Sequence, residues 1–184
     1  MFPEIETTSG ETAVKTFASR ALLAVLGLCA ALLLVPVGSA HAATLLSCVG
    51  TETDTYDPPV TLTPQMTTIH VVGNLPLCPL GGSVSSVRWD YSTSNMKSCV
   101  DLLTPNSGTM KLLYNDGLTS DFTYTTTITV VGGNNVVTQT GTITAGEFAG
   151  ATAEAVKTQL AIDPLCIGGI ASSAGATTLT IVSV

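Results

Sequence analysis

The stretch that most constrains the fold is residues 121–131, where apolar and hydroxyl side chains alternate. The apolar members at even positions are Phe122, Tyr124, Ile128 and Val130, and threonine occupies positions 123, 125, 127 and 129. Successive side chains of a β-strand point to opposite faces, so a period of two predicts a strand with one apolar face. The opposite face of this strand would carry hydroxyl groups.

Turn residues on both sides predict that this strand belongs to an antiparallel meander. Asp116-Gly117 precedes it and predicts a two-residue hairpin turn with Gly117 at positive φ. Gly- and Asn-rich residues 132–135, and then Ala145-Gly146, predict two further turns. We therefore expect strands at 109–114, 118–131, 136–144 and 148–160. The last of these is alanine-rich, and a helix is the alternative reading there.

The rest of the chain predicts more short strands, at 46–56, 65–72, 84–91 and 177–184. Pro58 and Pro59 are expected to end the first strand because proline cannot donate to a ladder. Residues 74–82 and 92–97 are expected to be loops, and 99–103 a short strand or a helical turn. Eight or nine strands predict an all-β domain, either an antiparallel Greek-key sandwich of immunoglobulin-like type or a small closed barrel.

The beginning of the chain predicts export. An uncharged apolar run covers residues 21–35, Lys15 and Arg20 precede it, and the small-x-small sequence Ala40-His41-Ala42 follows it. These features are typical of a secretory signal peptide. We expect residues 1–42 to be removed and residues 43–184 to form a single secreted, extracellular domain.

Four cysteines follow the expected cleavage site: Cys48, Cys78, Cys99 and Cys166. An even number in an exported chain predicts two disulfides. Three pairings are possible, and the expected strand at 84–91 separates Cys78 from Cys99. The interpretation favours Cys48–Cys99 and Cys78–Cys166. Paired in this way, the cysteines are unsuited to thiol catalysis or metal binding.

Charge and motif content argue against several classes of function. After residue 42, ten carboxylates face four cationic side chains, a net charge of −6, and no basic patch suits nucleic acid or an anionic membrane. The one histidine after residue 42, His70, lies in an expected strand, and no catalytic motif includes it. Asp54 and Asp57 are interpreted as solvated surface carboxylates. We therefore expect no enzymatic activity, no cofactor and no metal.

One segment has the composition of a partner-binding loop. Residues 75–80 are stiffened by two prolines and tethered by Cys78. Trp89, the single tryptophan, is expected to pack in the core or at its rim, with an exposed binding role as the alternative. The candidate partner-binding residues are Leu75, Pro76, Leu77, Pro79, Leu80 and Trp89.

Three stretches resemble small secreted actinobacterial proteins: GTMKLLYNDGLTSDF at 108–122, GTITAGEFAG at 141–150 and CVGTE at 48–52. Tyr114 departs from the tryptophan expected in that group. The resemblance implies an extracellular compartment and a host type. It implies no activity, because none is established for the group.

The leading hypothesis for function is a secreted, non-enzymatic interaction module, an adaptor or subunit of an extracellular assembly such as a toxin complex. One alternative is a protease inhibitor that uses the loop around Cys78, since a stiffened, disulfide-tethered loop is pre-organised for binding. The other is a carbohydrate- or lipid-binding domain that uses a barrel mouth or a sheet face. A stable protein partner would distinguish the first hypothesis from the last.

Overall fold

The structure, a computed structural model, describes residues 42–162 and 166–184. The predicted signal peptide covers residues 1–42, and residues 1–41 of it lie outside the described residues. Within the described part of the chain, no helix has the length and apolar character needed to cross a membrane.

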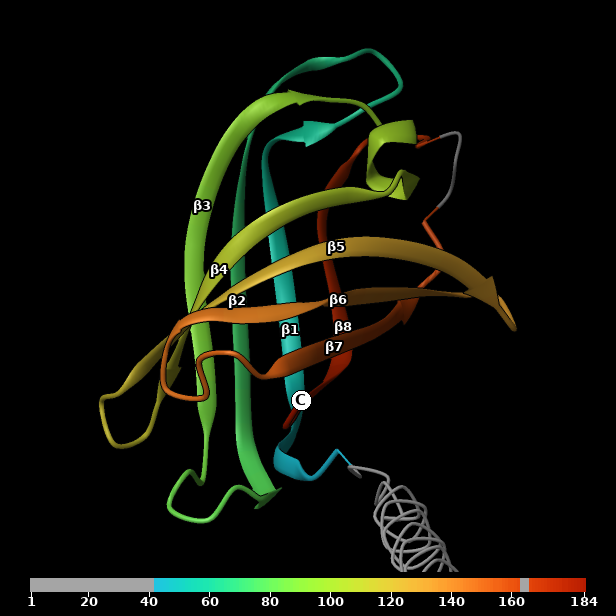
Figure 1. The fold of residues 1–184 in the computed structure, drawn as a ribbon. Helices are drawn as coiled ribbons and strands as arrows, with labels where there is room; N and C mark the ends of the chain where they lie inside the picture. The colour runs from blue at the N-terminus through green and yellow to red at the C-terminus, as the bar shows by residue number, and fades with distance from the viewer. Residues whose placement is uncertain (1–41, 163–165) are drawn as a thin grey trace, which may run out of the picture. The chain divides into compact units, whose positions relative to one another are not determined.

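Eight antiparallel strands form a closed barrel (Figure 1). They are β1 (Thr44–Val60), β2 (Gln65–Leu80), β3 (Val87–Lys97), β4 (Asn106–Tyr114), β5 (Thr119–Val131), β6 (Asn134–Gly146), β7 (Thr152–Leu160) and β8 (Ile170–Val182). Each strand pairs with the next along the chain, and β8 pairs with β1 to close the ring. The predicted small closed barrel is confirmed, whereas the connections are up-and-down rather than Greek-key.

The predicted meander is present as β4 to β7, and the alanine-rich segment is strand β7 rather than a helix. Phe122 and Tyr124 are buried as expected from their parity. Val130 shares that parity but is exposed, because it lies near the β5–β6 turn. The alternation therefore predicts the strand correctly, but not how far its inner face stays covered.

The turn between β4 and β5 contains three residues instead of the predicted two. The Tyr114 amide donates to the Leu118 carbonyl, and the Gly117 amide donates to the Tyr114 carbonyl, both at 3.0 Å. Gly117 has a φ of +86°, which confirms the predicted positive φ. A tight turn followed by a left-handed glycine is the usual three-residue hairpin loop.

Replacing Gly117 tests this turn. Nothing lies within 4 Å of a Cβ added at Gly117, so a substitution there acts through the backbone alone. We expect Gly117→Val to lower the free energy of unfolding by more than about 1 kcal/mol, because a β-branched residue is strained at positive φ. Gly117→Asn is the control and should cost much less, since Asn tolerates this conformation. Coincident urea curves for wild type and Gly117→Val would contradict the turn.

Several strands are longer than predicted. For example, β1 passes through Pro58 and Pro59, β2 includes the expected loop around Cys78, β3 includes residues 92–97, and β8 begins at Ile170. The two prolines are tolerated because they need not donate to a ladder. Pairing of β1 with β2 ends at Asp57, and the pairing of β1 with β8 shifts between Thr55 and Val60. Proline is found in strands at such interruptions.

The disulfides join Cys48 to Cys78 and Cys99 to Cys166, so the favoured pairing was wrong. Cys78 lies in β2 rather than in a free loop, and the β1–β2 register places it beside Cys48. Cys99 precedes the 3-10 helix η2 (Val100–Leu103), and Cys166 lies between β7 and β8. The second bond therefore joins two connections that are far apart in the sequence.

Tryptic mapping without reduction distinguishes the pairings. Cleavage after Arg88, Lys97, Lys111 and Lys157 places Cys48 and Cys78 in one peptide, residues 43–88 of the mature chain. We expect that peptide to carry an internal disulfide, and peptide 98–111 to be linked to peptide 158–184. Either of the other two pairings would join all three peptides into one species.

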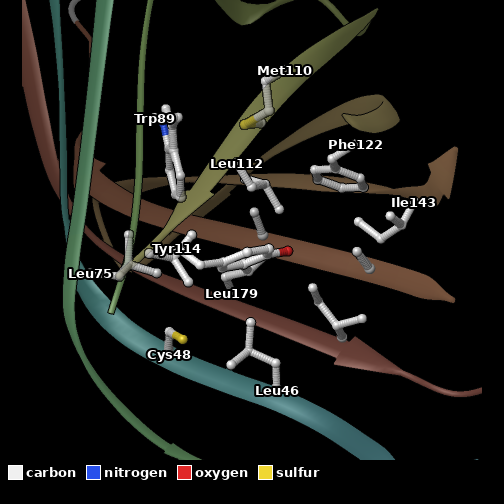
Figure 2. Packing of buried hydrophobic residues seen from close by; sticks show 14 of the residues in the cluster. Leu46, Cys48, Leu75, Trp89, Met110, Leu112, Tyr114, Phe122, Ile143 and Leu179 are labelled. Atoms are coloured by element: carbon white, nitrogen blue, oxygen red, sulfur yellow. The ribbon is translucent and has the colours of Figure 1, made fainter. Parts of the chain in front are cut away.

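One half of the barrel interior is an apolar core (Figure 2). Its largest fully buried side chains include Trp89, Phe122, Leu46, Leu75, Leu112, Ile143, Leu179 and Ile181. Figure 2 shows Leu46, Leu75, Leu112 and Phe122 converging from β1, β2, β4 and β5. Burial of each such side chain contributes about 1.5–3 kcal/mol to folding.

A smaller apolar cluster covers the end of the barrel where β1 finishes. It contains Tyr56, Val60, Cys99 and Cys166, with Leu102 of η2 packed against it. The Cys99 amide donates to the Thr61 carbonyl at 3.0 Å. The β3–β4 connection is thus fastened to this end by a disulfide and a backbone hydrogen bond.

Candidate functional site

Between the apolar core and this covered end, the barrel interior is polar. Glu52 is buried and Asp54 is largely buried on β1, whereas Thr51, Thr53 and Thr55 are exposed or half-exposed. On this strand the carboxylates face inward and the hydroxyls face solvent. Asp54 is therefore not the solvated surface carboxylate that the sequence suggests.

The inward carboxylates share one cation, Lys157 of β7. Its Nζ lies 3.0 Å from Glu52 Oε1 and also contacts Asp54 Oδ2. The Lys157 side chain is only 6% exposed. These contacts link β7 to β1 across the intervening strand β8. A buried charge is tolerated only with such partners, because desolvation is otherwise prohibitive.

Two glycines make room for the side chains that reach Glu52. Gly175 of β8 and Gly73 of β2 are its register partners on the two neighbouring strands. A Cβ at Gly175 would lie 2.8 Å from Lys157 Cγ, and one at Gly73 would lie 2.0 Å from the Trp89 ring. Glycine at both positions lets Lys157 and Trp89 lie against the wall and reach Glu52 from opposite sides.

Hydrogen bonds complete the surroundings of the two carboxylates. Trp89 Nε1 donates to Glu52 Oε2 at 2.9 Å. Ser173 Oγ donates to Asp54 Oδ2 at 3.0 Å, and the Tyr56 hydroxyl lies 3.4 Å from the same oxygen. Three of the four carboxylate oxygens therefore have donors. Asp54 Oδ1 has none.

The buried charges shift each other's ionisation. Burial raises the pKa of Glu52 above its ordinary 4.5, and the nearby Asp54 acts in the same direction, while Lys157 opposes the shift. Burial acts to lower the pKa of Lys157, but the attraction of Asp54 and Glu52 outweighs it and raises that pKa above 10.5. Lys157 thus stays charged, whereas ionisation of Glu52 costs free energy because its carboxylate is buried.

Tyrosines surround the carboxylates. Burial is the main cause that raises the pKa of Tyr56 to about 12, with Asp54 adding to it. Burial is the main cause that raises the pKa of both Tyr91 and Tyr124, and each of the two also affects the pKa of the other. Both also feel the charges of Glu52 and Asp54. These phenols stay neutral at physiological pH.

Four buried polar atoms have no hydrogen-bond partner within the part of the chain that the structure describes: Asp54 Oδ1, Thr126 Oγ1, Asn135 Nδ2 and Gln159 Oε1. They come from β1, β5, β6 and β7. Gln159 has the inward parity of Lys157, and Asn135 is its direct register partner. Thr126 has the inward parity of Tyr124, which feels both carboxylates. All four side chains therefore have inward parity or are buried on the inner face of the barrel wall.

The barrel wall is incomplete beside this region. β3 and β4 pair only at Val87–Tyr114 and Arg88–Leu113, and Figure 1 shows the two strands diverging beyond that contact. Thr93 and Asn95 have the inward parity of Trp89, yet both are exposed. The seam between β3 and β4 therefore has few backbone hydrogen bonds, and the inward-parity residues of β3 beyond Tyr91 are solvent-exposed.

The structure divides the predicted partner-binding residues. Leu75 and Trp89 are buried in the core and cannot contact a protein partner, which corrects that part of the prediction. Core packing of Trp89, the favoured interpretation, is confirmed. Pro76, Leu77, Pro79 and Leu80 are exposed on the outer wall. Leu77 there lies opposite Val49 in the β1–β2 ladder.

The histidine considered as a catalytic candidate lies on the outside of the barrel. His70 is exposed and its Nε2 lies 2.7 Å from Asp90 Oδ1 on the neighbouring strand β3, so it is an ordinary strand residue as predicted. Among the described residues, no group of three or more His, Cys, Asp or Glu side chains could hold a metal ion.

Sequence reasoning missed the polar interior because both faces of β1 are polar. Two signals could have found it. Gly73 and Gly175 interrupt strands in mid-course, which indicates close approach of another group. Lys157 shares the parity of Ala153 and Ala155, which are buried, so a charged side chain stands in an inward series.

Comparison with known proteins gives no match. No protein-family model matches the chain, and no curated protein and no solved structure is significantly similar to it. The resemblance to secreted actinobacterial proteins stays a prediction. The candidate site must be argued from its own geometry.

Replacing Lys157 tests the ion cluster. Lys157→Met removes the cation but keeps most of the side chain, and leaves Glu52 and Asp54 buried without it. We expect the free energy of unfolding at neutral pH to fall by about 3–5 kcal/mol. Lys111→Met is the control, because Lys111 forms an exposed ion pair with Asp121. This substitution should change the free energy of unfolding by less than about 1 kcal/mol.

Two further measurements separate lost charge balance from lost packing. A raised carboxyl pKa means that the protonated form favours folding, so the Lys157→Met deficit should shrink as pH falls toward 4.5. The triple change Lys157→Met, Glu52→Gln, Asp54→Asn should regain stability at neutral pH, because no unpaired charge is left. A deficit that is independent of pH and persists in the triple variant would contradict the ion cluster.

Proposed function

We propose that the mature domain is an exported, non-enzymatic binding protein that holds a small polar ligand in the polar part of the barrel interior. One observation carries this proposal: four polar atoms on four strands are buried in the barrel interior, all without a partner in the described chain. Two disulfides are compatible with an oxidising, extracellular environment.

Buried polar groups without a hydrogen-bond partner are energetically costly. A buried polar atom without a hydrogen bond costs about 1–3 kcal/mol, so native proteins keep few of them and pair those with ligand or water. Four such atoms in one barrel interior indicate partners from outside the chain. A few fixed polar groups in an otherwise packed site are typical of small-molecule binding, and eight-stranded barrels can hold one small ligand.

Access and pre-organisation support the same function. In this proposal a ligand enters at the β3–β4 seam, where the ladder is limited to two residue pairs. The site lies on strands held by continuous ladders and by buried ion pairs, so its groups are fixed before a ligand arrives. An acyl chain would leave the polar groups unsatisfied, so the lipid-binding alternative is less favoured than a polar ligand.

The remaining hypotheses differ in support. The inhibitor hypothesis depended on a free loop around Cys78, but residues 75–80 belong to β2 and pair with β1. The adaptor hypothesis keeps one observation in its favour. Leu77, Leu80 and Val49 are exposed apolar side chains on the outer wall, and such surface can contact another secreted protein. We retain it as the second candidate.

Trp89 provides the test, because it is the single tryptophan and contacts Glu52. Its fluorescence should be followed while sugars, polyols, amines, amino acids, organic acids and a fatty acid are titrated. We expect a saturable change for at least one polar class. No response to any polar class, or a response to the fatty acid alone, would contradict the proposal.

A double variant links the response to the site. Thr126→Val with Gln159→Leu removes two unpartnered polar groups without a change of charge. We expect this double variant to abolish the fluorescence response. The urea midpoint should stay equal or rise, because the variant removes two buried polar groups that have no hydrogen-bond partner. Thr125→Val with Thr158→Val, on the exposed face of the same strands, is the matched control and should bind normally.

A further inference from the structure

We propose that the ligand is a small organic cation, with a primary ammonium group that binds at Asp54 Oδ1. This inference rests on the proposed function and adds the chemical class of the ligand. It is argued from the charge balance of the interior, from the types of unpartnered atom and from the surrounding aromatic rings.

The charge balance is the first argument. Within the polar interior the described ionic groups are Glu52, Asp54 and Lys157, two anions and one cation. Lys157 already contacts both carboxylates, so it has little left to offer an incoming anion. A ligand with one positive charge neutralises the cluster, whereas an anion would add to the excess of negative charge. Buried charges are most stable when fully paired.

The unpartnered atoms are the second argument. Asp54 Oδ1 and Gln159 Oε1 can only accept hydrogen bonds, and Thr126 Oγ1 can accept one. An ammonium group has three donors and no acceptor. Gln159 lies two residues beyond Lys157, which contacts Asp54, so the two acceptors belong to the same part of the wall. A charged donor on a carboxylate makes the strongest hydrogen bond of this kind.

The fourth unpartnered atom indicates what else the ligand carries. Asn135 Nδ2 is a donor, and Asn135 lies directly opposite Gln159 in the β6–β7 ladder. It would suit a hydroxyl or carbonyl oxygen a short distance from the ammonium group. Amino alcohols and amino amides have both features.

The aromatic rings are the third argument. Tyr56, Tyr91 and Tyr124 lie close enough to Asp54 to feel its charge. The faces of neutral aromatic rings attract cations and not anions. Tyr91 also lies on β3, one of the two strands that border the seam through which a ligand would enter. Carboxylate and ring faces therefore favour the same sign of ligand charge.

The test compares matched ligands on the unaltered protein, so it does not depend on a variant that folds. Butylamine and 1,4-diaminobutane are titrated against 1-butanol, 1,4-butanediol, butyrate and glucose, with Trp89 fluorescence and calorimetry as readouts. We expect the amines to saturate and to bind at least about tenfold more tightly than the matched alcohols, a difference of about 1.4 kcal/mol. Butyrate should not bind.

A pair of variants then locates the cation. Asp54→Asn keeps the shape of the side chain and removes its charge, and should weaken amine binding by about tenfold or more. Asp90→Asn makes the same change on the outer wall, where Asp90 pairs with His70, and should leave amine affinity unchanged. Equal losses in both variants would overturn the inference. If Asp54→Asn does not fold, Thr126→Val with Gln159→Leu takes its place.

The outcomes separate this inference from the proposed function. Alcohols or glucose that bind as tightly as the amines would overturn the cation inference, while the proposed binding function would stand. Saturation by butyrate would also overturn it, since the charge argument would then have the wrong sign. If no ligand class binds, both proposals fail.

Discussion

The ion pairs of Lys157 with Glu52 and Asp54 are the interaction on which the rest of the barrel interior depends. Gly175 leaves room for the Lys157 side chain. The second carboxylate oxygen of Glu52 accepts a hydrogen bond from Trp89, and Gly73 leaves room for the Trp89 ring. The cluster around this buried cation thus involves residues on five strands, including β7, which carries Lys157 itself. Such pairs add little net stability, but they are costly to break. Stability comes mainly from the apolar half, which leaves the polar half available for binding.

Most of the fold follows from local signals in the sequence. Alternation and turn residues from Thr109 onward predict the strands of the meander, because a strand period and a left-handed glycine are local properties. The disulfides could not be predicted in the same way. Their pairing depends on which strands are neighbours, and the decisive fact, that Cys78 lies in β2 beside Cys48, is one of register. The extent of β1 past Pro58 likewise depends on where its partners stop.

The candidate site was much less predictable. Alternation on β1 separates Glu52 and Asp54 from the threonines, but both sets are polar, so the pattern does not say which faces inward. Which face of β1 points inward depends on Lys157, which is more than a hundred residues away in the sequence. Closure of the barrel is needed to bring Lys157 next to Asp54 and Glu52. Partner-binding character was assigned instead to Trp89 and Leu75, two apolar residues whose burial follows from the completed barrel.

The short contact between β3 and β4 has a mechanical consequence. A barrel with unbroken ladders has a fixed circumference, because any widening must break hydrogen bonds. Here seven of the eight joints are long, whereas the β3–β4 joint has two residue pairs. The sheet therefore behaves as a split cylinder, which can widen by bending while every long ladder stays intact. The Cys99–Cys166 bond ties the connection between the two split strands to the β7–β8 connection, so that end of the split is anchored to another part of the barrel.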